Sequence, residues 1–134
     1  MDRGRRLPIA ALAGGLALMA DAAQAHHSFA VFFSSDQDVI PLTGVVKEFH
    51  FTNPHGIIKI VVPAGAGKPE QDWTLETNSP SILVRRGWNK DIMKVGDVIK
   101  VQGWPARDGS NYMRLKDAQR ADGTPIGTRP AGAP

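Results

Sequence analysis

The sequence predicts an all-β domain with one short helix, folded as an OB-like five-stranded Greek-key barrel. Three observations support this. Several segments alternate apolar and polar residues with a period of about two, a single helix-like segment follows the third of them, and two more strand-like segments come after it. Three strands, a helix and two strands is the element order of the OB-fold. A plain β-sandwich does not need the helix.

Residues 1–25 have the features of a secretory signal peptide, so they are left out of the fold argument. Three arginines come first, Leu7 to Ala20 is uncharged and apolar, and Ala23-Gln24-Ala25 is the small-x-small pattern that signal peptidase cuts. The apolar run is shorter than the roughly 20 residues that cross a bilayer, so a retained anchor is the weaker alternative. We expect a periplasmic or secreted protein that begins at His26 and has no membrane span after processing.

The first three strands are expected over residues 42–51, 56–62 and 72–77. A turn at Thr52–Gly56 separates the first two, because proline presets φ and glycine permits positive φ. A loop rich in Gly, Ala and Pro separates the second from the third. Residues that share a face along these strands are Ile58, Ile60 and Val62 in the second strand, and Trp73, Leu75 and Thr77 in the third.

The segment Ser79–Gly87 predicts a helix of about two turns, with serine as N-cap, proline at the first position, basic residues in the last turn and a glycine stop. It should close one end of the barrel and bury Ile82 and Leu83. Strands over 98–104 and 112–119 complete a domain that spans residues 26–122. Residues 123–134 are rich in proline and glycine, and we expect a disordered tail there.

Composition excludes several classes of protein. The chain has no cysteine, which rules out disulfides, thiolate metal sites and cysteine nucleophiles. Cleavage after residue 25 leaves 109 residues, enough for one domain with its own core. Thirteen basic and eleven acidic residues remain, without a concentrated basic stretch, so a nucleic-acid partner is not expected.

Short motifs run through the whole mature chain. They are His26–Phe29 (HHSF), Leu42–Val46 (LTGVV), Thr52–His55 (TNPH), Trp73–Glu76 (WTLE), Arg85–Trp88 (RRGW), and Val95–Asp97 (VGD) followed by Gly103–Ala106 (GWPA). In order and spacing they resemble a family of uncharacterised secreted bacterial proteins, a domain of unknown function. The resemblance implies a small exported β-domain. It implies no activity, substrate or catalytic residue.

All four histidines of the chain, His26, His27, His50 and His55, lie within thirty residues. After cleavage, His26 would offer its α-amine and its Nδ1 atom to one metal ion, and a second imidazole would complete the arrangement called a histidine brace. Nitrogen ligands without thiols favour Cu(II). We therefore predict copper as the candidate cofactor, with His26, His55 and His27 as ligands. His55 is the best second imidazole because Pro54 and the turn would hold it.

Two further residues are candidates at this site. His50 in the first strand and Glu76 in the third can serve either as additional ligands or as groups that orient a ligand. The alternative interpretation is purely structural: His26 and His27 would belong to a solvated terminus, His50 to the barrel surface and His55 to a turn.

No catalytic motif is present, so we expect a binding protein and not an enzyme. No serine lies in a nucleophile elbow, and Asp72 and Glu76 on one strand face would be about 13 Å apart, too far for a glycosidase pair. The group Arg85, Arg86 and Trp88 can contact an envelope protein partner, an anion or a sugar. Alternatively, its arginines complement the helix end and Trp88 packs beneath them. The alternatives to copper binding are therefore an accessory module of the cell envelope and a small-molecule or glycan-binding domain.

Overall fold

The computed structural model describes residues 32–33 and 39–128. The predicted signal peptide at 1–25, the candidate ligands His26 and His27, and the end of the predicted tail at 129–134 lie outside these ranges. Within the described ranges, no helix is long and apolar enough to cross a membrane.

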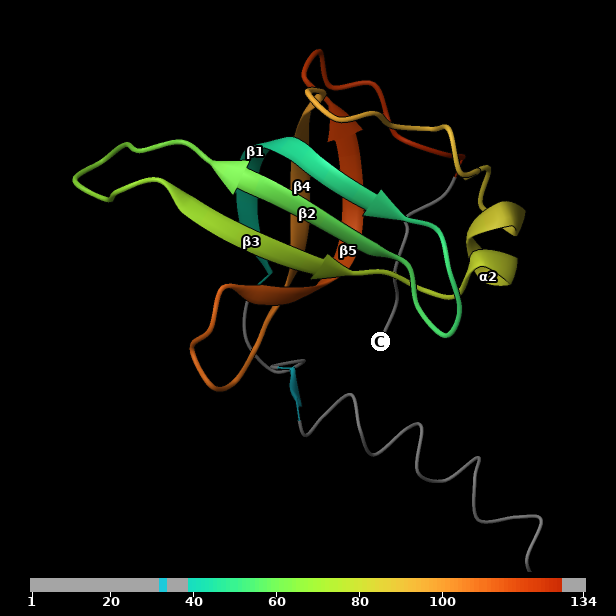
Figure 1. The fold of residues 1–134 in the computed structure, drawn as a ribbon, viewed down its shortest axis with the longest axis horizontal. Coiled ribbons are helices and arrows are strands. Elements are labelled where there is room, and N and C mark those ends of the chain that lie inside the picture. The colour runs from blue at the N-terminus through green and yellow to red at the C-terminus, as the bar shows by residue number, and fades with distance from the viewer. Residues whose placement is uncertain (1–31, 34–38, 129–134) are drawn as a thin grey trace, which may run out of the picture.

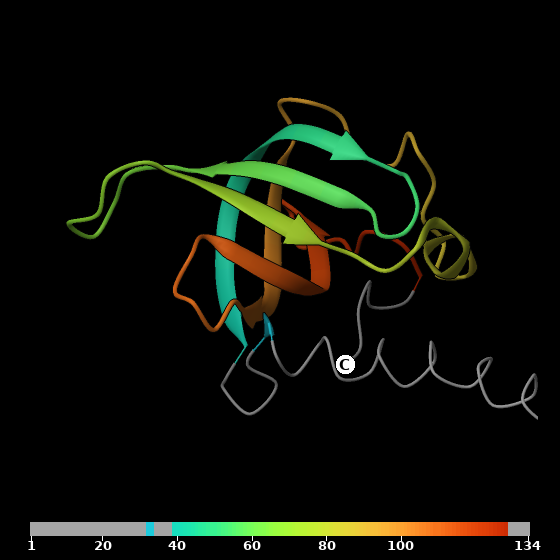
Figure 2. The same cartoon turned by 60° about the horizontal axis from the view of Figure 1, so that its bottom comes forward.

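In the described part of the chain, five strands form a closed barrel accompanied by one short helix (Figures 1 and 2). The elements are β1 (Ile40–His50), β2 (Ile57–Val62), β3 (Gln71–Glu76), α2 (Pro80–Arg85), β4 (Val98–Pro105) and β5 (Tyr112–Arg120). Around the barrel the strands follow the order β1-β2-β3-β5-β4. The predicted fold class and element order are confirmed.

Strand β1 pairs with neighbours on both sides and thereby closes the barrel. Ile40–Val45 pairs antiparallel with β4, and Val45–His50 pairs antiparallel with β2. Gly44 lies where the two ladders meet: a Cβ atom there would come within 2.7 Å of the Val61 carbonyl oxygen, so this position requires glycine. Strand β2 also pairs antiparallel with β3, and β4 pairs antiparallel with β5, while β3 and β5 are joined by a parallel pairing.

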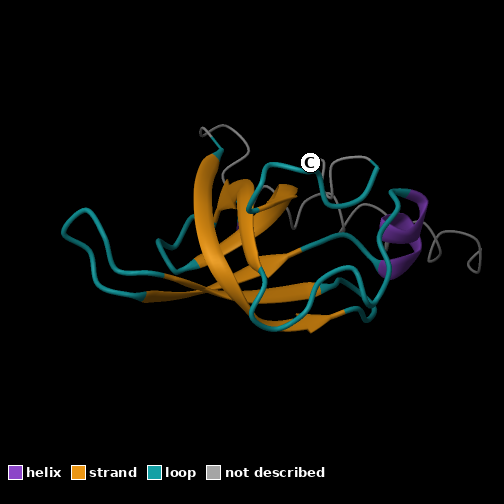
Figure 3. Cartoon of the chain, turned by 90° about the horizontal axis from the view of Figure 1, so that it is seen from above, coloured by secondary structure: helices purple, strands orange, loops and turns teal. Residues whose placement is uncertain are grey.

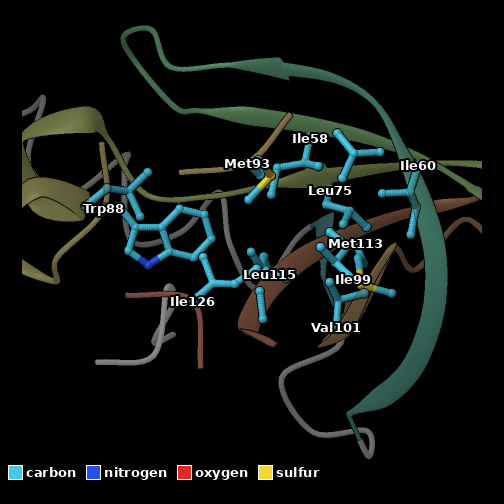
Figure 4. Close-up of a cluster of buried hydrophobic side chains, with 13 residues drawn as sticks. Ile58, Ile60, Leu75, Trp88, Met93, Ile99, Val101, Met113, Leu115 and Ile126 are labelled. Atoms are coloured by element: carbon cyan, nitrogen blue, oxygen red, sulfur yellow. The ribbon is translucent and has the colours of Figure 1, made fainter. Parts of the chain in front are cut away.

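The barrel interior is filled by the residues that alternate along the strands. Ile58, Ile60 and Leu75 are fully buried, on the faces predicted from the sequence. The cluster also contains Val46, Leu83, Trp88, Met93, Ile99, Val101, Met113, Leu115, Ala118 and Ile126. Figure 4 shows Trp88 at the end of this cluster nearest the helix, beside Leu115 and Ile126.

Helix α2 has about the predicted length, but it buries fewer residues than predicted. It covers six residues, at the end of the molecule opposite the β2–β3 loop (Figure 3). Leu83 is fully buried, but Ile82 is 36% exposed, so the prediction that both are buried is wrong for Ile82. The reason is geometric: consecutive residues point about 100° apart around a helix, and a helix this short presents one narrow face to the barrel.

The predicted boundary at residue 122 is also wrong, because residues 123–128 are part of the domain. Ile126 is only 2% exposed, and its backbone N–H donates to the Ala118 carbonyl at 2.9 Å. The Thr128 N–H donates to the Arg86 carbonyl at 2.7 Å. Burial of one large aliphatic side chain holds this Gly- and Pro-rich segment on the barrel, where composition alone indicated disorder.

Candidate functional site

A polar cluster forms where the ends of β2 and β3 meet β5. The parallel register places Thr74 opposite Tyr112 and Glu76 opposite Arg114. Because side chains alternate along a strand, the buried Met113 points into the barrel while Tyr112 and Arg114 point to the other face, together with Glu76. The cluster therefore follows from the register of two strands that are far apart in the sequence.

Glu76 is the centre of this cluster. Its Oε2 atom accepts a hydrogen bond from the Tyr112 hydroxyl at 2.7 Å, and its Oε1 atom accepts one from Arg114 Nη1 at 2.9 Å. The same Oε1 atom lies 2.6 Å from His55 Nδ1. Both carboxylate oxygens are thus engaged by side chains, and the glutamate side chain is only 17% exposed.

Arg114 is a buried cation that is held in place by several acceptors. Its side chain is 8% exposed. Besides Glu76, its guanidinium donates to the Thr77 carbonyl at 2.7 Å and to the side-chain oxygen of Asn78. Burial lowers the pKa of Arg114, and the charge of Glu76 opposes this effect. The guanidinium stays charged at physiological pH, so Glu76 neutralises a charge that has little contact with water.

Tyr112 connects the cluster to the N-terminal side of the chain. Burial, followed by the hydrogen bond to Glu76, raises the pKa of Tyr112, so its hydroxyl remains a donor over the physiological range. Its ring stacks on Phe33, with centroids 5.8 Å apart and planes inclined by 20°. Phe33 is 5% exposed.

His55 is presented by the β1–β2 turn at the edge of this buried cluster. The turn is tied to the end of β3, because Thr77 donates to the Gly56 carbonyl through its backbone N–H at 2.8 Å and its hydroxyl at 3.0 Å. A Cβ atom on Gly56 would lie 2.6 Å from the Thr77 hydroxyl, so the close approach needs glycine directly after His55.

The contact with Glu76 determines which ring nitrogen of His55 is available. A deprotonated nitrogen and a carboxylate oxygen repel each other at 2.6 Å, so Nδ1 carries a proton. Nε2 is then the nitrogen that can offer a lone pair to a metal ion or accept a proton. The His55 side chain as a whole is 47% exposed, so a ligand from solvent can reach part of the ring.

His50 belongs to a separate, exposed group of charges. Its Nε2 atom lies 2.8 Å from Glu48 Oε2, and the same oxygen lies 3.0 Å from Lys59 Nζ. The hydrogen bond with His50, followed by that with Lys59, lowers the pKa of Glu48. The structure therefore does not bring His50 together with His55 through a shared partner.

The residues of the predicted partner-binding group, Arg85, Arg86 and Trp88, differ in how far they are exposed to solvent. Arg85 is exposed and Arg86 is half-buried, but Trp88 is only 2% exposed and belongs to the core. A partner that docks on this surface cannot use the Trp88 ring, so its assignment as a partner-binding residue is wrong, and the packing alternative is the one the structure has. The ring fills the end of the barrel because it is the largest apolar side chain near that opening.

Three residues of the cluster were missed in the sequence: Phe33, Tyr112 and Arg114. The only signal was the alternation Tyr112, Met113, Arg114, which marks two polar side chains on one strand face. Their relation to Glu76 depends on the parallel β3–β5 pairing, which no local pattern encodes.

The comparisons with known proteins place the chain in a family. The sequence model of a family described as a family of unknown function, DUF6152, matches residues 13–114, more than half of the chain. The chain belongs to this family. The DUF6152 match confirms the predicted membership of an uncharacterised family, and its range runs from before Phe33 to Arg114, so it includes the whole cluster. No curated protein and no solved structure matches the chain.

Proposed function

We propose that this DUF6152 protein is exported and acts as a non-catalytic copper-binding protein of the periplasm or the cell exterior, with His55 Nε2 as one ligand. The observation that carries the proposal is the 2.6 Å contact between His55 Nδ1 and Glu76 Oε1. Histidines that bind metals commonly direct their second ring nitrogen to a carboxylate, which sets the ring orientation and makes the ligating nitrogen more basic. His55 has this arrangement on a half-exposed side chain.

The other ligands in this proposal come from the processed N-terminus. Across residues 32–33 and 39–128, no group of three His, Cys, Asp or Glu side chains is placed to hold a metal ion. His26 would supply an α-amine and an imidazole, and His27 is the next imidazole along the chain. Together with His55 they form a nitrogen set without thiols, which favours Cu(II).

Glu76 has an orienting role in this proposal and is not a ligand. The sequence left both roles open, but both oxygens of Glu76 accept hydrogen bonds and the same carboxylate neutralises the buried Arg114. Coordination to a metal would withdraw negative charge from that buried cation, which is unfavourable. His50 is a weaker candidate because its carboxylate partner, Glu48, is 44% exposed and is shared with the exposed Lys59, whereas Glu76 is 17% exposed.

The test uses mature protein recovered from export, so that no residue precedes His26. Copper(II) titration by calorimetry at neutral pH should give one equivalent bound with release of protons, and the affinity should fall as the pH is lowered, because the ligands must lose protons to bind. Loss of a group that orients a metal ligand typically lowers the metal affinity about 10–100-fold. His55→Ala removes the ligand itself, so it should lower the copper affinity by at least this factor. The matched control is His50→Ala, which removes the other histidine–carboxylate contact and should change the affinity little.

A second variant tests the N-terminal ligands independently. One glycine inserted before His26 moves the α-amine out of the chelate ring and should weaken binding strongly. Unchanged copper affinity in both the His55→Ala and the extended protein would show that the histidines are ordinary surface residues. Equal losses in His55→Ala and His50→Ala would show that the contact with Glu76 does not select the ligand.

A further inference from the structure

A hollow on the outer surface of β1, β4 and β5 lies apart from the His55 cluster. Its volume is about 200 Å³, and no residue of the cluster lines it. Two rows of side chains cross the three strands there, because the antiparallel registers align them: Pro41, Gln102 and Asp117 in the first row, and Thr43, Lys100 and Gln119 in the second. Side chains alternate along a strand, so these point outward while Val101 is buried. The hollow is therefore lined mainly by polar side chains.

Two opposite charges line the hollow without neutralising each other. Lys100 and Asp117 occupy diagonal positions on β4 and β5, which places their backbones about 7–8 Å apart. Within the described ranges they form no ion pair, and the Lys100 side chain has no hydrogen bond. Asp117 Oδ1 accepts a hydrogen bond from the Ala118 backbone N–H at 2.9 Å, which leaves Oδ2 as an acceptor. The hollow thus offers one cationic donor and one anionic acceptor to a ligand.

Uncharged donors and acceptors surround these two charges. Gln102 and Gln119 each carry an amide and Thr43 carries a hydroxyl, and in the part of the chain that the structure describes none of these side chains has a hydrogen-bond partner. An amide both donates and accepts, so it can pair with amide or hydroxyl groups of a ligand. A ligand that reproduces the hydrogen bonds such groups make with water can replace that water without a large loss.

We propose that this hollow binds a free α-amino acid with a short polar side chain, independently of the proposed copper site. The carboxylate of the ligand contacts Lys100 and its ammonium group contacts Asp117. Its side chain contacts the amides of Gln102 and Gln119. One positive and one negative group favour a ligand that carries both charges and no net charge. The volume lies below the roughly 300–1,000 Å³ of sites for drug-sized ligands, which favours a molecule of this size. No lining residue is aromatic, so a nucleobase finds no ring on which to stack.

The experiment titrates isotopically labelled, metal-free mature protein with L-asparagine and follows the backbone amide signals by NMR. Signals of β1, β4 and β5 beside the hollow should shift along one saturable curve. Lys100→Met and Asp117→Asn should each weaken binding about threefold to tenfold, because each removes a charged hydrogen-bonding group at a partly exposed site. Lys68→Met is the matched control: it removes an exposed lysine in the loop between β2 and β3, outside the hollow, and should leave the affinity unchanged.

Two altered ligands test which group contacts which residue. N-acetyl-L-asparagine lacks the ammonium charge and should bind the unmodified protein more weakly than L-asparagine does, but in Asp117→Asn the acetyl group should cost little more. L-asparaginamide lacks the carboxylate and should show the same relation with Lys100→Met. The absence of saturable shifts at the hollow, losses that do not follow these pairings, or tighter binding of D-glucose there than of L-asparagine would each overturn the proposal. The protein is metal-free throughout, so these outcomes are independent of copper binding.

Discussion

Removing the carboxylate of Glu76 tests the electrostatics of the cluster directly. Glu76→Ala leaves the guanidinium of Arg114, whose side chain is 8% exposed, without its counter-charge. Breaking a buried ion pair by removal of one partner costs about 3–5 kcal/mol. The lower end of this range applies here, because Arg114 keeps the Thr77 carbonyl and the Asn78 side chain as acceptors. The Tyr112 hydroxyl also loses its acceptor, which adds about 1 kcal/mol.

The loss should be visible as a large fall in the unfolding temperature. For a domain of this size, 1 kcal/mol corresponds to about 4–8 °C, so a total loss of about 4 kcal/mol should lower the midpoint by roughly 16–32 °C. Thermal and urea unfolding of the mature protein, followed by circular dichroism, measures both the midpoint and the free energy of unfolding.

The chain contains a matched control for this change. Glu48, like Glu76, contacts one histidine and one cation, His50 and Lys59, but its side chain is 44% exposed. Surface ion pairs contribute little to stability, so Glu48→Ala should lower the midpoint only slightly. Equal losses in the two variants would refute the argument that burial of Arg114 makes Glu76 necessary.

A double variant tests the reason for the loss. Arg114→Met in the Glu76→Ala protein removes the unpaired charge and replaces it with an apolar side chain of similar length. Replacing both members of a buried pair is often close to neutral, so the double variant should regain much of the stability that Glu76→Ala loses. A double variant that is less stable than Glu76→Ala would contradict this account.

Three further predictions concern processing, packing and pH. Exported protein should begin at His26, and an intact mass that retains the leader or starts at another residue would contradict this. Leu83→Ala should cost about 2–5 kcal/mol in chemical denaturation because Leu83 is fully buried, whereas Ile82→Ala on the same helix should cost much less; similar losses would show that the helix packs differently. Because the folded-state pKa of Glu48 is lowered from 4.5, its contribution to stability is present above pH 4.5 and is lost as the pH falls through the lower folded value. The stability difference between the unmodified protein and Glu48→Gln should therefore be largest near neutrality and vanish in acid, and a difference independent of pH would refute this.

The elements of the fold could be predicted from local patterns in the sequence. The alternation that buries Ile58 and Ile60 has a period of two, and the proline and glycine at the ends of the helical segment are stereochemical signals that act within a few residues. The order of the elements then limits the fold to few topologies, and the OB-like barrel is one of them. Burial within α2 was predicted less well, because a helix of six residues carries too few positions to define a face.

The sequence by itself determined the fold class, the candidate histidine at position 55 and a carboxylate at position 76. Only the tertiary structure decided that these two side chains meet, and that Tyr112, Arg114 and Phe33 belong with them. The physical reason is the parallel pairing of β3 with β5. Its register brings Tyr112 and Arg114 to Glu76, which lies 36 and 38 positions earlier in the sequence, and the periodicity of a single strand cannot specify a partner at that distance. The tertiary structure also decided that residues 123–128 are ordered on the barrel. Ile126 can be buried only because Trp88 and Leu115, at the end of the barrel, leave space for its side chain.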